Sequence, residues 1–419
     1  MQKELQAKGY YCQDCNSLGN VVTEKGSENV DPAVLLAKIK HCYEVAVEPE
    51  LTEGPSDLDA SVKDKVLEAV GGTSTTFSKV RHNLQDACLV QKMLANGVLT
   101  VKGGSGKVVV VELGAGIILY VLLPIAKHAC SLSYIIGRGM LGLAIMSVLP
   151  AAPTEPGAAP HLLMIERNGL KFKADKLLRE RSMGHNRVRM DIRHCFLPKL
   201  PVIADYDSLR AAGYPPTVVL VAKHLCGLAT DLSVSSIHHL VRENTTEATS
   251  SDGPAFQGLA IATCCHHACS WVDYTGIEWL CTEQGFTEAE FGVMKQWSGW
   301  AHTIKFTDED KKGSARCERT SGTEAEWSAG NDEEEACCEH SAPVNESTVR
   351  PADLSSREMS DVGKMVKRIL DQGRVMYLRR LGLPARQVRY CDPSLSPECY
   401  MIIATTGTSD SVSSCSNTS

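Results

Sequence analysis

Hydrophobic and polar positions follow two different periods along the chain. In residues 32–47 and 78–99, apolar side chains recur every three or four positions, which predicts amphipathic helices. Beyond them come short, nearly continuous apolar runs that alternate with helical stretches, namely 107–113, 161–167, 187–191, 217–223 and 258–264. Such runs suit strands buried on both faces of a parallel sheet. The alternation predicts an α/β domain with a mostly parallel, doubly wound sheet.

Changes in composition predict six segments. Serine, acidic residues and few large aliphatic side chains mark the two parts that are expected to be disordered. The predicted order is a polar linker (1–30), a helical N-terminal segment (31–104), the sheet domain (105–306), a disordered acidic insertion (307–358), a helix and strand that complete the domain (359–406) and a disordered tail (407–419).

Charge and cysteine content narrow the possible partners and compartment. The 419 residues carry a net charge of −7, so an anionic partner would have to be held by a local basic patch. The chain has 17 cysteines and a polar, charged start with no secretory pattern. We therefore expect a reducing compartment, the nucleus or the cytoplasm, with free thiols rather than a disulfide framework.

The most hydrophobic stretch of the chain is residues 117–136. It carries Pro124, Lys127 and His128 near its middle. A membrane-spanning helix rarely holds an unpaired lysine at its centre, so we expect no membrane span here.

Acidic residues and glycines mark the ends of three predicted strands. VELGAG, residues 111–116, is a strand that enters a glycine turn, and it places Glu112 inside an apolar run. Glu166 and Asp191 end the next two runs, where carboxylates suit the hydroxyls of a ribose and the amino group of an adenine. This order is typical of S-adenosylmethionine-dependent methyltransferases, although a nicotinamide site shares its first two features.

Four further motifs follow in order: KHLCGLATDL (223–232), IATCCHHACSWVDYTG (261–276), MKQWSGWA (294–301) and ILDQGRVMYLRRLG (369–382). Together with VELGAG and MIER, they make the chain resemble the eukaryotic family of tRNA 2′-O-methyltransferases that modify position 4 of the acceptor stem. The resemblance implies a Rossmann-like methyltransferase fold, S-adenosylmethionine as cofactor and the tRNA acceptor stem as partner.

The cofactor loop departs from the family pattern, which reads Glu-x-Gly-x-Gly-basic-Gly-x-Leu. Removal of residues 117–137 would restore it as VELGAGRGMLGLAI, so we interpret this segment as an insertion into the loop. The alternative function is therefore a catalytically impaired tRNA-binding member of the family. The cofactor residues that the resemblance implies are Glu112, Gly114, Ala115, Gly116, Gly139, Glu166 and Asp191.

Zinc is a second expectation from the family, whose members usually begin with two small cysteine/histidine modules. This chain is expected to begin after them, and Cys12 and Cys15 do not match their ligands. In CCHHAC, Cys264, Cys265 and Cys269 are weak candidate zinc ligands, because neighbouring residues on an extended strand point to opposite faces. Buried cysteines packed as small hydrophobic side chains remain the alternative.

The motifs KHLCG and CCHHAC are expected to face each other at the carboxyl ends of the fourth and fifth strands. We predict that Lys223 or His224 removes the proton from the ribose hydroxyl, and that His266 or His267 contacts the ribose or a phosphate.

Basic residues on or just after the last predicted helix are candidate RNA contacts. A solvated helix face is the alternative for them. They are Lys364, Lys367, Arg368, Arg374, Arg379, Arg380, Arg386 and Arg389.

Overall fold

The structure, a computed structural model, describes residues 30–54, 57–70, 77–99, 107–114, 139–150, 159–167, 173–200, 202–212, 216–242, 255–302, 351 and 354–406. The predicted linker 1–29, the insertion 117–137, most of the acidic segment and the tail lie outside these residues. So do Ala115 and Gly116 of the predicted cofactor loop.

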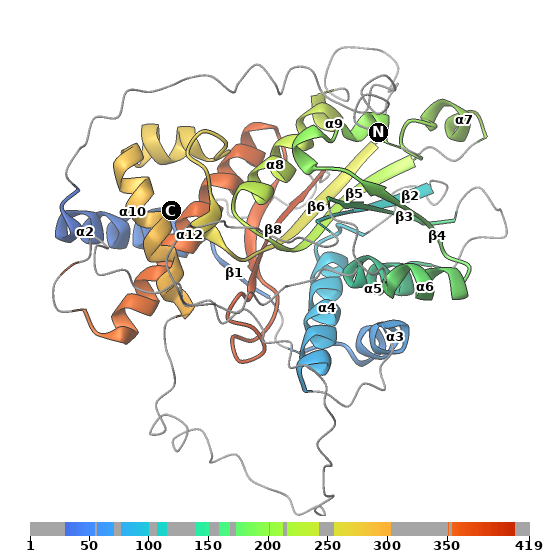
Figure 1. Cartoon of the computed structure of the whole chain (residues 1–419), viewed down its shortest axis with the longest axis horizontal. Helices are drawn as coiled ribbons and strands as arrows, with labels where there is room; N and C mark the ends of the chain where they lie inside the picture. The colour runs from blue at the N-terminus through green and yellow to red at the C-terminus, as the bar shows by residue number, and fades with distance from the viewer. Residues whose placement is uncertain are drawn as a thin grey trace, which may run out of the picture.

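Eight strands of the described residues form one sheet in the order β1-β7-β8-β6-β5-β2-β3-β4 (Figure 1). Neighbours among β2 to β6 are parallel, whereas β8 is antiparallel to both β6 and β7. The predicted mostly parallel α/β sheet is thus confirmed. The strands are β1 (Thr52–Glu53), β2 (Lys107–Leu113), β3 (His161–Glu166), β4 (Gly184–Arg189), β5 (Pro216–Leu225), β6 (Ala255–Thr263), β7 (Ala385–Arg389) and β8 (Tyr400–Thr405).

The direction of strand addition reverses between β2 and β5. From β2 the chain adds β3 and β4 on one side, and it then returns to add β5 and β6 on the other. Because these strands are parallel, their carboxyl ends meet at one edge of the sheet. Ligands of such sheets bind beyond that edge, at the reversal point.

Helices cover both faces of the sheet (Figure 1). Along β2, Val108 and Val110 enter the core on one face, and Val109 and Val111 enter the core on the other, as a continuous β-branched run requires. The first face is covered by α3 (Ala60–Val70), α4 (Phe77–Ala95), α5 (Met140–Val148) and α6 (Lys173–Glu180). The second is covered by α7 (Tyr206–Ala211), α8 (Leu228–Ser236), α9 (His238–Arg242) and the end of α12 (Ser356–Arg380).

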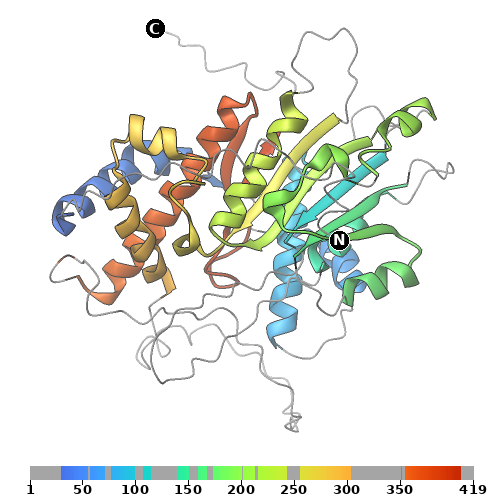
Figure 2. The same ribbon diagram turned by 45° about the horizontal axis from the view of Figure 1, so that its top comes forward.

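A third, aromatic-rich core lies away from β4, where both views place α2 and α10 beside α12 (Figures 1 and 2). It joins α2 (Pro32–Cys42), α10 (Glu288–Ser298) and the first half of α12. Its Trp297 stacks on Trp300 with ring centroids 4.8 Å apart. A capping box starts α12, because the side chains of Ser355 and Glu358 each accept from the other's backbone N–H.

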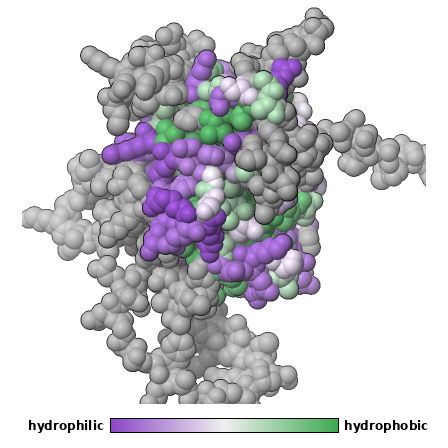
Figure 3. Space-filling view, turned by 90° about the vertical axis from the view of Figure 1, so that its right-hand side faces the viewer, coloured by the Kyte–Doolittle hydropathy of each residue, from purple (hydrophilic) through white to green (hydrophobic). Residues whose placement is uncertain are grey.

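The described surface is mixed in polarity. Hydrophilic residues cover much of the face on the β4 side, with hydrophobic residues gathered in patches between them (Figure 3). Within the described ranges no helix is long and apolar enough to cross a membrane, and the apolar stretch 117–136 lies outside them.

Replacement of Gly142 by alanine should destabilise the fold. A Cβ at Gly142 would lie 2.5 Å from Glu112 Oε2 and 2.6 Å from Leu162 Cδ1, so α5 would have to move off the sheet. We expect the free energy of unfolding in urea to fall by about 1–3 kcal/mol in Gly142→Ala. The control is Gly292→Ala on α10, where an added Cβ would meet nothing within 4 Å. This substitution should stabilise the helix by about 0.5–1 kcal/mol. Equal effects of the two variants would contradict the packing described here.

Candidate active site at the carboxyl edge of the sheet

Three residues of the predicted cofactor set lie at adjacent strand ends. Gly114 follows β2 with φ +69° and donates its N–H to the carbonyl of Ile165 on β3, at 3.0 Å. Glu166 is the last residue of β3 and is buried. Asp191 follows β4, where its Oδ1 accepts from the backbone N–H of Arg193 at 2.9 Å. The glycine turn and the two carboxylates therefore share one edge, as the sequence predicted.

Glu112 ties the glycine turn to helix α5. It is buried within β2, and its Oε2 accepts from the backbone N–H of Gly142 at 2.9 Å. Gly139 precedes α5 with φ +72°, a conformation that favours glycine. The strand before segment 115–138 and the helix after it thus lie side by side. Burial raises the pKa of Glu112 to about 7.

The side chain of Lys223 extends from β5 to helix α4. Its Nζ donates to Asp86 Oδ1 at 2.7 Å and to the carbonyl of His82 at 3.2 Å. Both side chains of this ion pair are largely buried, and both influence the pKa of Glu112 electrostatically. Asp86 was not among the residues predicted from sequence, where it appears only as one acidic residue within an amphipathic helix.

His224 occupies a bulge at the end of β5. Lys223 pairs with Ala262 and Leu225 with Thr263, so His224 is an extra residue with no counterpart on β6. It adopts φ +59°, which is uncommon for a side chain with a Cβ and costs about 1–3 kcal/mol. Burial, followed by the charge of Lys223, lowers the pKa of His224 to about 3. His224 is therefore neutral near pH 7.

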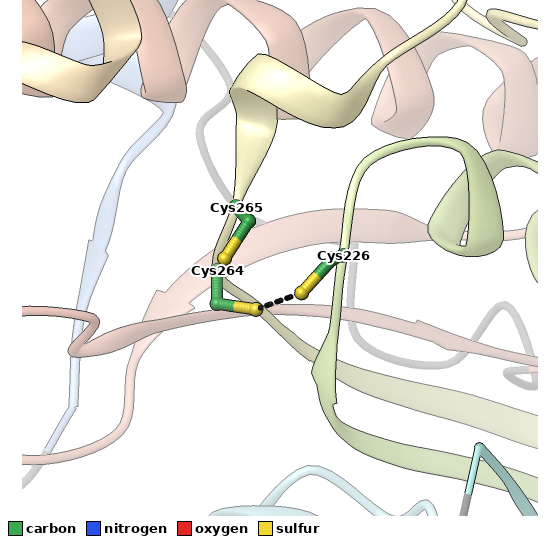
Figure 4. Close-up of side chains that lie close together, drawn as sticks. All are labelled: Cys226, Cys264 and Cys265. Atoms are coloured by element: carbon green, nitrogen blue, oxygen red, sulfur yellow. Dashed lines mark hydrogen bonds between the residues drawn. The ribbon is translucent and has the colours of Figure 1, made fainter. Parts of the chain in front are cut away.

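The motifs KHLCG and CCHHAC meet, as expected. Cys226 Sγ lies 3.0 Å from Cys264 Sγ, and the side chain of Cys265 approaches the same point (Figure 4). A Cβ on Gly227, which has φ +41°, would lie 2.3 Å from the backbone carbon of Ala268, so only glycine permits this approach. Hydrogen bonds from Cys226 and Cys264 lower the pKa of the Cys265 thiol.

A buried ion-pair network anchors α12 behind these loops. Arg374 is fully buried and donates to Asp231 Oδ2 on α8 at 2.7 Å and to Asp371 Oδ1 on its own helix at 2.9 Å. Asp371 also accepts from Thr263 on β6 at 2.8 Å. Although burial by itself would raise it, the pKa of Asp371 is held well below its ordinary value by His266 and then by Arg368.

His266 and Cys269 belong to this network. His266 Nε2 lies 2.9 Å from Asp371 Oδ1, its Nδ1 lies 2.9 Å from the carbonyl of Cys264, and its side chain is buried. This position conflicts with the substrate contact predicted for His266, whereas His267 is exposed. Cys269 Sγ accepts from Arg374 at 3.0 Å, so it does not join Cys264 and Cys265 as a ligand.

The predicted RNA contacts divide into buried and exposed residues. Lys367, Arg368 and Arg374 are buried in ion pairs with Glu398, Asp371 and Asp231, and this burial argues against the surface contacts predicted for them. The helical period of α12 turns these basic residues toward the core. The partly exposed members are Lys364 beside Asp361, Arg379 beside Glu50, Arg380 beside Glu278 and Glu283, Arg386 beside Asn96, and Arg389 beside Glu53.

Comparison with known proteins identifies a class and then a family. A family model described as "Methyltransferase TRM13" matches residues 84–405, which include the whole carboxyl edge described above. The chain is therefore a methyltransferase-family protein, and it belongs to the TRM13 family. A methyltransferase family implies S-adenosylmethionine as the methyl donor.

Relatives with curated names are similar to this chain over much of its length. A human protein named "tRNA:m(4)X modification enzyme TRM13 homolog" is 28% identical over 58% of this chain and 54% of its own length. A Yarrowia lipolytica protein named "tRNA:m(4)X modification enzyme TRM13" is 28% identical over 78% of this chain and 60% of its own length. A Vanderwaltozyma polyspora protein of the same name is 22% identical over 95% of this chain and 81% of its own length. The chain thus spans little more than half of the human relative. No solved structure matches it.

Loss of Arg374 should destabilise the protein far more than loss of an exposed lysine on the same helix. Arg374→Met leaves two buried carboxylates without the cation that they share. We expect the free energy of unfolding to fall by about 3–5 kcal/mol. Lys364→Met removes a surface pair with Asp361 in which the lysine is 58% exposed, and should change stability by less than about 1 kcal/mol. Urea unfolding of both variants measures the difference, and similar values would contradict the network.

The burial of Glu112 predicts how stability depends on pH. Its folded pKa of about 7 lies above the ordinary 4.5, so the associated stability is present below about pH 4.5 and is lost as the pH rises to about 7. Glu112→Gln stays neutral, so its free energy of unfolding relative to the natural chain should rise by about 3 kcal/mol across this window. Denaturant unfolding at several pH values tests this, and a constant difference would contradict it.

Proposed function

We propose that this chain transfers a methyl group from S-adenosylmethionine to the 2′-hydroxyl of the ribose at position 4 of a tRNA acceptor stem, on a Rossmann-like methyltransferase fold. The observation that carries the proposal is the carboxyl edge of the sheet, where Gly114, Glu166 and Asp191 stand at the ends of β2, β3 and β4. Lys223 pairs with Asp86 near the end of β5, the strand next to β2. Family membership supports the class of reaction, and the names of the relatives support tRNA as the substrate.

The hydrogen-bond acceptors at this edge of the sheet suit the polar groups of S-adenosylmethionine. Glu166 at the end of β3 can accept from the two hydroxyls of a ribose, and Asp191 at the end of β4 can accept from an adenine amino group. The left-handed backbone at Gly114 lets the chain turn close to a ligand. When bound, S-adenosylmethionine supplies a methyl group on a positively charged sulfur.

Lys223 is the residue best placed to handle the proton of the acceptor. A ribose hydroxyl is a weak nucleophile, so its oxygen must lose a proton as its bond to the methyl carbon forms. We assign this proton to the Lys223–Asp86 pair, in which Nζ lies 2.7 Å from Asp86 Oδ1. The Nζ of Lys223 accepts the hydroxyl proton as one of its own protons passes to the carboxylate. His224, whose pKa is about 3, is too weak a base for this step and instead orients the substrate.

The reaction itself is tested by mass spectrometry of tRNA incubated with the chain and the donor. We expect one methyl group on the ribose of nucleotide 4 of the acceptor stem, resistant to alkaline cleavage. A methyl group found on a base, or on the ribose of another nucleotide, would contradict the proposed position of methyl transfer. Absence of any transfer would favour the alternative function below.

The alternative, a tRNA-binding member with impaired catalysis, rests on the segment 117–137 between the two halves of the cofactor motif. Deletion of these residues joins Gly116 to Arg138 and restores the family pattern. Calorimetry with S-adenosylmethionine separates the two possibilities. Binding by the deletion variant alone would support the impaired member, and methyl transfer by the full chain would exclude it.

Substitution of Lys223 should reduce turnover without preventing cofactor binding. We expect Lys223→Ala and Lys223→Arg each to lower kcat by about 10²–10⁴-fold, because arginine keeps the positive charge but cannot accept a proton. Affinity for S-adenosylmethionine, measured by calorimetry, should stay unchanged. Lys65→Ala, at an exposed position on α3, is the control. Full activity of Lys223→Arg would show that charge, rather than proton transfer, is what the site needs.

A further inference from the structure

Three cysteine side chains converge where β5 and β6 end, and we call them the thiol cluster: Cys226, Cys264 and Cys265. Their sulfur atoms all lie within 4.8 Å of one another, and those of Cys226 and Cys264 are 3.0 Å apart. Figure 4 shows the three side chains pointing toward one another from two separate loops. Neither the family match nor the names of the relatives assigns any role to them.

The convergence arises because β6 ends at Thr263, one residue before the end of the apolar run predicted as a strand. Strand alternation would turn Cys264 and Cys265 to opposite faces, but β6 ends at Thr263 and a helical turn follows at His266–Ala268. Cys265 has φ −87° and ψ 80°, outside the strand geometry. Both sulfurs can therefore reach Cys226, which follows Leu225 at the end of β5.

We propose that the thiol cluster binds a thiophilic metal ion, with Zn²⁺ as the occupant, through three thiolates and one ligand from solvent. Zinc–sulfur bonds of about 2.3 Å in a tetrahedron place sulfurs about 3.8 Å apart, within the range that the cluster spans. Three soft donors select zinc over calcium or magnesium. Cys264 is buried, whereas Cys226 and Cys265 are half-buried, so the fourth position faces the solvent side.

The bound ion would hold together the two loops that form the acceptor side of the site. One loop follows Lys223 and His224 at the end of β5 and carries the Gly227 turn. The other follows β6 and carries the backbone at Ala268 that Gly227 touches. The test of the metal site is independent of the proposed reaction, because it measures metal content and not methyl transfer.

The test measures metal bound to the full chain. The reduced protein, with Cys12 and Cys15 changed to serine to remove that CxxC pair, is loaded with Zn²⁺, desalted and analysed by inductively coupled plasma mass spectrometry. We expect one zinc per chain, and a loss of affinity of more than about 100-fold in each of Cys226→Ser, Cys264→Ser and Cys265→Ser. Cys281→Ser, a half-buried cysteine outside the cluster, is the matched control and should retain the zinc.

Two further measurements test zinc binding even if a serine variant folds poorly. Cys265→His preserves a zinc ligand, so it should restore binding that Cys265→Ser loses. In the chain with Cys12 and Cys15 changed to serine, Co²⁺ should give thiolate charge-transfer absorption that is lost when Zn²⁺ displaces it. Zinc content unchanged by all three serine variants would overturn the proposal. So would a Cys226–Cys264 disulfide in the metal-free protein that survives reduction and blocks loading.

Discussion

The fold depends most on the buried ion pairs that surround Arg374. The guanidinium of Arg374 bridges Asp231 on α8 and Asp371 on α12, and Arg368 supplies a second cation to Asp371. Asp371 also accepts from Thr263 at the end of β6 and contacts His266 just beyond it. Charges this deeply buried are tolerated only when each is paired and hydrogen-bonded, so the geometry of the whole group is fixed. The network therefore determines where β6 ends and where the loop after it turns.

That turn sets the acceptor side of the proposed site. The loop after β6 packs against Gly227, and the bulge at His224 allows β5 to present Lys223 toward α4 and Asp86. On the other side of β5, strands β2, β3 and β4 bring Gly114, Glu166 and Asp191 to the same edge. The proposed donor and acceptor sides of the site thus lie on neighbouring parallel strands, at the point where strand order reverses.

Much of this arrangement could be predicted from sequence, because it follows from hydrophobic period. The apolar runs that became β2, β3, β5 and β6 are continuous, whereas the polar run ARQVR of β7 and the two-residue β1 carry no such signal. The order of Gly114, Glu166 and Asp191 along the edge followed from strand succession alone.

Long-range pairings could not be predicted in this way. Whether a basic residue of α12 faces solvent or a buried carboxylate depends on Asp231, which lies 143 positions earlier in the chain than Arg374. The convergence of Cys226 on Cys264 and Cys265 likewise depends on β6 ending at Thr263. The role of Asp86 emerges only from the contact between α4 and β5.

The most direct measurement is a crystal structure of the chain with S-adenosylhomocysteine and an acceptor-stem duplex. The account predicts the adenosine ribose beside Glu166, and the O2′ of nucleotide 4 within about 3 Å of Lys223 Nζ. A cofactor bound away from the ends of β2 and β3, or a ribose hydroxyl that no atom of Lys223 approaches, would contradict it.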